Sequence, residues 1–260
     1  MRLGMVTYQV AAEWNIETII QKCEATGFEG VELRTTHAHG VEIAMAQAKR
    51  QEVKKRFDDS KVRLWGLGTT CEFHAVEMAQ VKKNVEEAKE FILLAVEVGA
   101  VGIKVRPNGL QEKAGIPKEK TLEQIGRAYR EVGQFGKDHG IECWMEVHGK
   151  DTCLPANMKV IIDAADHDNC LVCWNSNMAD RDANGKIDDN FALLKNKISS
   201  CHITELANRD YPWRRLFTLL KEAGYGDRFT LFEGKGTTDP DRFLPYYRAL
   251  WRELTGDPAP

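Results

Sequence analysis

The segment 141–149, I-E-C-W-M-E-V-H-G, carries the residues whose types and spacing best suit chemistry. If it forms a buried strand, Glu146 and His148 share one face, because successive side chains of a strand alternate between faces. A carboxylate and an imidazole in an apolar strand cost on the order of several kcal/mol unless each meets a partner. The pair is therefore either a buried ion pair with a neighbouring strand or part of a metal or proton-transfer site.

Polar side chains also stand at the downstream ends of other expected strands. These are Glu32 and Arg34, Lys104 and Arg106, Asn175 and Asn177, His202, and Glu233. Two carboxylates, an imidazole and an amide oxygen form a ligand set that suits Mn, Mg, Co or Zn. The alternative is that each is a separately satisfied polar group of the core, and this would have to hold for several adjacent strands.

Hydrophobic periodicity predicts eight strands that alternate with helices. The expected strands are 3–9, 30–34, 62–70, 101–105, 141–149, 170–175, 198–204 and 229–232. The expected helices are 15–26, 41–58, 76–98, 122–139, 155–165, 191–195, 212–223 and 239–254. This order predicts an α/β fold, a closed (β/α)8 barrel of parallel strands that forms one domain over residues 1–260. An open doubly wound sheet would normally carry a glycine-rich loop after its first strand, where this chain has Y-Q-V-A-A-E-W.

Composition and net charge limit the classes of molecule that the protein is expected to bind. The 260 residues are 43% hydrophobic and 29% charged, which predicts a large folded core. A net charge of -3 gives no basic surface for nucleic acid, and the longest apolar run is too short to span a membrane. The first residues enter a strand without a signal-peptide pattern, so we expect a cytoplasmic protein with a small-molecule carbohydrate partner. A homo-oligomer is compatible with this expectation. The seven scattered cysteines fit small buried hydrophobes.

Several short segments carry a family resemblance. They are G-F-E-G-V-E-L at 27–33, K-V-R-P at 104–107, E-V-H-G at 146–149, the strand with Asn175, C-H-I-T-E at 201–205 and L-F-E-G at 231–234. In this order they resemble the xylose isomerase-like TIM barrels, which include sugar phosphate isomerase/epimerases, ketose 3-epimerases, inosose dehydratases and endonuclease IV. The resemblance implies one divalent ion, held by Glu146, Asn175, His202 and Glu233.

The resemblance also implies a mechanism. Next to the ion, Glu146 and Glu233 would remove and return a proton through an enediolate, while Lys104, Arg106, His148 and Glu32 would bind the substrate. Two positions depart from the family pattern, because Asn175 replaces an aspartate and Met178 replaces a histidine. An asparagine oxygen can bind a metal but brings no charge, so weaker metal binding is expected.

The expected function is that of a metal-dependent isomerase or epimerase, with manganese as one suitable ion. Its substrate would be a sugar, a sugar phosphate or a related polyhydroxy carbonyl compound. A lyase or dehydratase that acts on a keto-sugar or inosose is an alternative, because elimination shares the first proton abstraction. A non-catalytic sugar-binding barrel is a further alternative. A nuclease like endonuclease IV would need more His and Asp ligands than follow His202.

Overall fold

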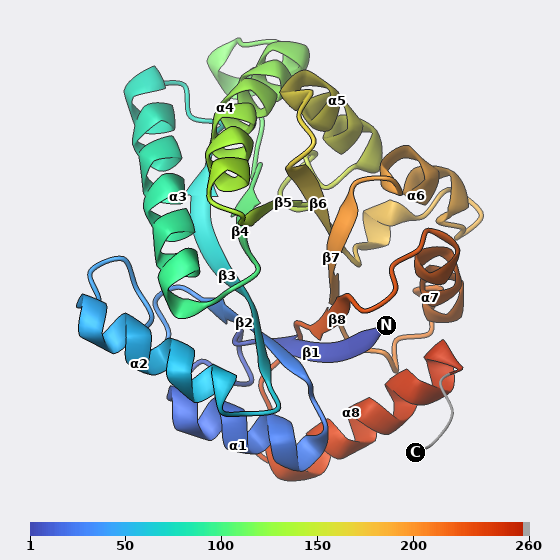
Figure 1. Ribbon diagram of the computed structural model, residues 1–260. Helices are drawn as coiled ribbons and strands as arrows, with labels where there is room; N and C mark the ends of the chain where they lie inside the picture. The colour runs from blue at the N-terminus through green and yellow to red at the C-terminus, as the bar shows by residue number, and fades with distance from the viewer. Residues whose placement is uncertain (257–260) are drawn as a thin grey trace.

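The computed structural model describes residues 1–256 and contains eight parallel strands that close into a barrel in sequence order. The strands surround the centre of the molecule and the helices form an outer ring, as Figure 1 shows. The barrel closes where β1 (Arg2–Val6) pairs with β8 (Phe229–Phe232), with Met5 opposite Phe232. The predicted (β/α)8 barrel is thereby confirmed.

The remaining strands are β2 (Gly30–Arg34), β3 (Arg63–Glu72), β4 (Gly102–Arg106), β5 (Glu142–Glu146), β6 (Cys170–Asn175) and β7 (Ile198–Ile203). The α-helices are α1 (Ile16–Thr26), α2 (Gln47–Asp58), α3 (Met78–Val98), α4 (Lys118–Asp138), α5 (Pro155–Ala165), α6 (Asp188–Leu194), α7 (Trp213–Glu222) and α8 (Pro240–Thr255). Two short 3-10 helices, η1 (Glu112–Ala114) and η2 (Met178–Asp180), lie in the loops after β4 and β6.

Several element boundaries differ from the sequence-based expectation. The helix expected over 41–58 begins at Gln47, because the guanidinium of Arg50 donates to the carbonyls of Ile43 and Met45 and holds the preceding residues as a loop. The strand expected over 141–149 ends at Glu146. His148 therefore lies in the loop after β5, and its position is set by that loop rather than by the strand pleat.

The barrel interior on the side of the amino ends of the strands, here called the base, is filled by aromatic side chains. The indoles of Trp65 and Trp144 stack with their ring centroids 5.3 Å apart and their planes 13° apart. Gly66 and Gly102 make room for them, since a Cβ at either position would lie 2.5 or 2.6 Å from a ring carbon of Trp144. This interior cluster, which also contains Val6, Cys173, Phe229 and Leu231, is separate from the larger core between sheet and helices. The polar residues therefore lie above an apolar base.

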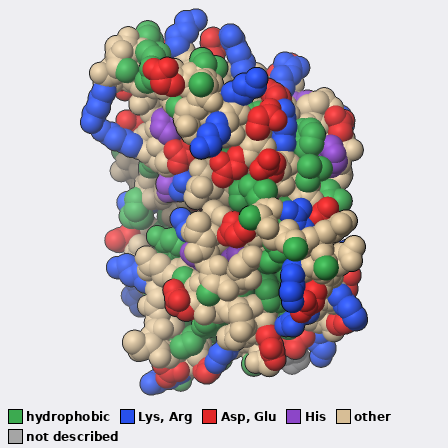
Figure 2. Space-filling view, turned by 90° about the vertical axis from the view of Figure 1, so that its left-hand side faces the viewer, with side chains coloured by type: hydrophobic (Ala, Val, Ile, Leu, Met, Phe, Trp, Pro, Cys, Tyr) green, Lys and Arg blue, Asp and Glu red, His purple; other side chains and the backbone are tan. Residues whose placement is uncertain are grey.

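The outer surface carries charges of both signs. On the face shown in Figure 2, basic and acidic side chains are interspersed, and no large region of one sign is visible. Within residues 1–256, no helix has the length and apolar character needed to cross a bilayer.

Candidate metal and substrate site

A layer of polar side chains lies directly above the aromatic base, at the ends of the strands. Its members are Glu32 from β2, Lys104 from β4, Glu146 from β5, Asn175 from β6, His202 from β7 and Glu233, which follows β8. All but Glu233 are buried, and Glu233 is 18% exposed at its side chain. The carboxyl ends of the strands are where (β/α)8 barrels place their active sites, so this layer is the candidate site.

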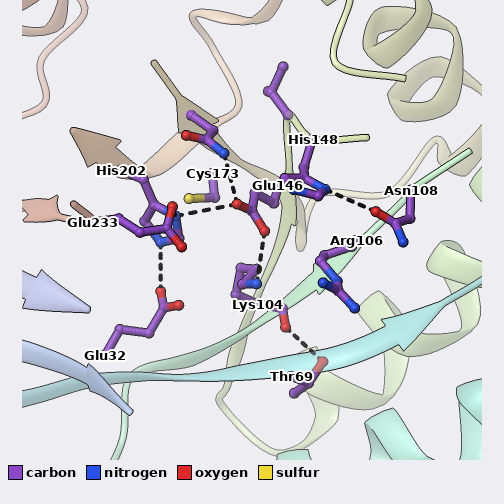
Figure 3. Close-up of polar contacts among 12 residues, drawn as sticks. Glu32, Thr69, Lys104, Arg106, Asn108, Glu146, His148, Cys173, His202 and Glu233 are labelled. Carbon is purple, nitrogen blue, oxygen red and sulfur yellow. Dashed lines mark hydrogen bonds and ion pairs between the residues drawn. The ribbon is translucent and has the colours of Figure 1, made fainter. Parts of the chain in front are cut away.

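His202 stands at the centre of this layer. Its Nε2 atom lies 3.1 Å from Oε2 of Glu32, and its Nδ1 atom lies 3.2 Å from Oε2 of Glu233 and 3.5 Å from Oε1 of Glu146. In Figure 3 the ring lies between Glu32 on one side and Glu146 on another, and dashed lines join it to both. A carboxylate can only accept a hydrogen bond, so the Nε2 atom of His202 carries a proton and donates a hydrogen bond to Glu32. The Nδ1 atom is the one turned toward Glu146 and Glu233.

The atoms around Nδ1 fit a metal ion. One ligand atom each from Glu146, His202 and Glu233 lies within 4.8 Å of the others. The Nδ1 atom is buried and has no hydrogen-bond partner among residues 1–256. An imidazole whose second nitrogen donates to a carboxylate is the usual arrangement of a metal-binding histidine, so the residues present suit a divalent cation.

Glu146 is held from two sides. Its Oε2 atom lies 2.8 Å from Nζ of Lys104, and its Oε1 atom accepts a 2.9 Å hydrogen bond from the Asn175 amide. Since a carboxylate cannot donate, the amide nitrogen of Asn175 must face Glu146, which leaves the amide oxygen free for a cation. Among the residues that the structure describes, none donates a hydrogen bond to that oxygen.

The charged groups of this layer shift one another's pKa values. Burial opposes ionisation of Glu146, but the Lys104 ammonium holds its pKa well below the ordinary value. Burial likewise would lower the pKa of Lys104, and the surrounding carboxylates raise it instead. For His202, burial would lower the pKa. The Cys173 thiol and the carboxylates of Glu32 and Glu233 raise it well above its ordinary value.

A second network lies beside Glu146, His202 and Glu233, which together are called the metal-type cluster. Arg106 and Asn108 both donate to Oε1 of Glu72 at 2.7 Å, and Nδ1 of His148 lies 3.0 Å from Oδ1 of Asn108. The Asn108 amide is oriented by Glu72, so its oxygen faces His148 and Nδ1 of His148 carries the proton. His148 is therefore held through Asn108 and has no direct bond to Glu146.

The structure brings Glu146, Asn175, His202 and Glu233 together, as the predicted ligand set requires. Lys104 lies against this set, whereas Arg106 and His148 belong to the second network. Glu32, which we expected among the substrate-binding residues, is 0% exposed beneath His202 and contacts that ring.

Two residues of the second network, Glu72 and Asn108, were not singled out from the sequence. The strand expected over 62–70 extends to Glu72, and this extension places the carboxylate at the barrel mouth. Asn108 adopts a left-handed backbone conformation with φ 63°, for which its residue type was the only signal in the sequence.

The geometry agrees with a comparison of the sequence with protein families. Residues 20–243 match the model of the xylose isomerase-like TIM barrel family. The chain belongs to this family. A comparison with curated protein sequences gives no match.

Several solved structures share the fold of this chain. D-psicose 3-epimerase from Clostridium cellulolyticum H10, solved with D-tagatose, superposes with a TM-score of 0.81 at 14% identity, over 98% of this chain and 99% of that one. The probable 3-DHS dehydratase AsbF from Bacillus anthracis gives a TM-score of 0.73 at 17% identity, over 99% and 100%. The IOLI protein, solved with a bound zinc atom, gives 0.71 at 15%, over 99% and 97%.

Proposed function

We propose that the protein is a divalent-metal-dependent isomerase or epimerase that acts on a sugar, a sugar phosphate or a related polyhydroxy carbonyl compound through an enediolate. The observation that carries the proposal is the orphaned Nδ1 atom of His202, which faces two carboxylates while Nε2 is bonded to a third. The sugar epimerases among the fold neighbours support it.

Glu146, Asn175, His202 and Glu233 would hold the ion. Such an ion, when bound, supplies Lewis acidity that makes a C–H bond next to a carbonyl easier to deprotonate. Two of the four ligands are carboxylates, so their charge balances that of a dication. Manganese suits this mixed oxygen and nitrogen set, as do magnesium, cobalt and zinc.

The chain's own groups would move the proton. Glu233 and Glu146 come from β8 and β5, and both carboxylates face the Nδ1 atom of His202 on β7. Glu233 is the more exposed of the two carboxylates, so it is the better placed to take a proton from a substrate carbon. We assign its return, on the other side of the substrate, to Glu146.

The remaining polar residues would bind and orient. The Lys104 ammonium keeps Glu146 ionised and has further N–H donors for a substrate oxygen. Arg106 and His148, which are fixed by Glu72 and Asn108, line the mouth for substrate hydroxyls. Glu32 orients His202.

Metal analysis tests the proposal. Protein purified without chelator should contain about one divalent ion per chain, and His202→Ala or Glu233→Gln should lose it, because each removes a ligand from a small set. Lys61→Met, an exposed site far from the cluster, is the matched control. Retention of the ion by both variants would place the site elsewhere. Turnover is then sought with added manganese on ketoses, keto-glycosides and inososes.

A dehydratase is the second candidate, and the fold neighbour named as a probable 3-DHS dehydratase favours it. Elimination begins with the same proton abstraction, so the same four ligands and the same base would serve. The substrate screen separates the two functions, since a dehydratase forms an unsaturated product whose absorbance rises in the ultraviolet. A bound ion without turnover of any compound would favour a sugar-binding barrel instead.

A further inference from the structure

Arg34 is a cation at the barrel mouth that the proposed chemistry does not use. It follows Glu32 by two residues on β2, so both side chains leave the same face of the strand. At a rise of about 3.3 Å per residue, Arg34 lies roughly 6.6 Å nearer the mouth than the carboxylate that holds His202. Its partner in register on β3 is Gly68, which has no side chain to cover it.

The guanidinium of Arg34 lies beside the ring of Tyr8, which follows β1. Its carbon is 5.8 Å from the ring centroid of Tyr8, and Tyr8 packs against the interior cluster that contains Trp65 and Trp144. The backbone on either side is fixed, because the Arg34 N–H donates to Oγ1 of Thr7 and the Arg34 carbonyl accepts from Nε2 of His39. The side chain thus starts from a rigid position.

Within residues 1–256, no carboxylate forms an ion pair with Arg34. Among these residues, the one hydrogen bond from its guanidinium to another side chain runs from Nη1 to Nε2 of His37 at 3.3 Å. The inward cations of β4 differ, because Lys104 pairs with Glu146 and Arg106 pairs with Glu72. Most of the N–H donors of Arg34 remain available.

His37 does not supply a compensating charge. Burial and the neighbouring Arg34 lower the pKa of His37, so the ring is neutral and accepts the Arg34 N–H through Nε2. Its Nδ1 atom lies 3.3 Å from Oγ1 of Thr7 and carries the ring proton. The ring therefore holds the guanidinium in place and leaves its positive charge unpaired.

We propose that Arg34 binds an oxyanion of the substrate, a phosphate or a carboxylate, at the end remote from the metal-type cluster. A half-buried guanidinium that lacks an acidic partner is the group that binds such anions most strongly, often through two parallel hydrogen bonds. The separation of roughly 6.6 Å between the levels of Glu32 and Arg34 along β2 corresponds to the length of several carbon–carbon bonds. The inference rests on the proposed function for the reacting end and names the substrate as an anionic polyhydroxy carbonyl compound rather than a neutral sugar.

The first experiment tests the anion site without the metal. Inorganic phosphate and acetate are titrated separately into protein purified without added metal, and binding is followed by protein NMR. At least one should saturate, and Arg34→Gln should weaken its binding about tenfold or more, while Arg34→Lys should weaken it less. Arg63→Gln is the matched control, an exposed arginine over Trp65 at the opposite end of the barrel. Equal binding by wild type and Arg34→Gln, or no saturation by either anion, overturns the proposal.

A second experiment separates the two sources of the oxyanion. D-fructose, D-fructose 6-phosphate and D-fructuronate are compared by calorimetry on manganese-loaded protein. Tighter binding of the phosphate or of the carboxylate, abolished by Arg34→Gln with D-fructose unaffected, supports the proposal and names the group. Binding of D-fructose as tight as that of both anions counts against it. If the protein bound no metal, the proposed isomerase function would be contradicted, but the titrations with phosphate and acetate would still test the anion site. Failure of the proposed function and failure of this inference can therefore be told apart.

Discussion

The Nζ atom of Lys104 lies 2.8 Å from Oε2 of Glu146, and the two side chains are only 6% and 3% exposed. A buried ion pair returns little net stability, because both groups lose their hydration, but loss of one partner leaves an uncompensated buried charge. Here the remaining charge would be a carboxylate that also belongs to the candidate ligand set. Metal binding and the stability of the fold are therefore linked at this pair.

Lys104→Met should destabilise the metal-free protein by about 3–5 kcal/mol, because it leaves Glu146 charged and buried. Manganese should recover part of this loss by supplying positive charge beside the same carboxylate. Thermal unfolding with and without manganese measures both effects, and the rise in Tm on adding metal should be larger in the variant than in wild type. A smaller rise in the variant would contradict the link. Lys61→Met, at an exposed site, should behave as wild type.

Glu32→Gln should weaken metal binding by about 10- to 100-fold, because the carboxylate that orients His202 is lost while no ligand is removed. Calorimetric titration of manganese into stripped protein provides the affinity. Glu72→Gln is the control, since Glu72 belongs to the second network and does not touch His202. Equal affinities in Glu32→Gln and wild type would show that the tautomer of His202 does not depend on Glu32.

With saturating manganese added, Glu233→Gln and Glu146→Gln should each lower kcat by about 10²- to 10⁴-fold on whichever substrate the screen finds, because an amide cannot accept a proton. Glu146→Gln also leaves Lys104 without its ion pair, so its unfolding is measured alongside. Circular dichroism checks that both variants fold. Near-normal kcat in both would remove these carboxylates from the chemistry.

Asn175→Asp should bind metal more tightly and unfold more easily without it. The new carboxylate would face Oε1 of Glu146, which now accepts a 2.9 Å hydrogen bond from the amide, so two negative charges meet until a cation lies between them. Turnover should stay flat or fall, because added negative charge lowers the Lewis acidity of the ion. Manganese titration and thermal unfolding of the stripped protein test both parts. If the affinities agree within error, Asn175 is not a ligand.

Asp180 should make stability depend on pH. Burial raises its pKa from 3.8 to about 8, although Tyr211 donates to its Oδ2 atom at 2.7 Å. Between these values the folded protein holds a proton that the unfolded chain releases, so stability should fall as pH rises from about 4 to about 8. Asp180→Asn, which resembles the protonated acid, should flatten this slope in urea unfolding at pH 5, 7 and 8.5. Asp168→Asn, with a side chain 95% exposed, should leave it unchanged.

The strands, and the polar residues at their ends, could be predicted because both follow from local patterns, whereas the grouping of Glu146, Asn175, His202 and Glu233 was implied by the family resemblance. Alternation along β5 and the apolar pattern of β8 place Glu146 and Glu233 at strand ends whatever the rest of the chain does. The role of Glu32 could not be predicted in this way, since it depends on contact across the barrel between β2 and β7. The same holds for His148, whose orientation is decided by Asn108, forty residues earlier in the chain.

The aromatic base fills one end of the barrel interior. Trp65 and Trp144 close the interior from below, and the ring of His202 lies above them with 0% exposure. An ion at Nδ1 would therefore have to arrive before the substrate and could depart only after the product. Exchange of the ion with solvent should consequently slow when the mouth is filled, which gives binding a compulsory order.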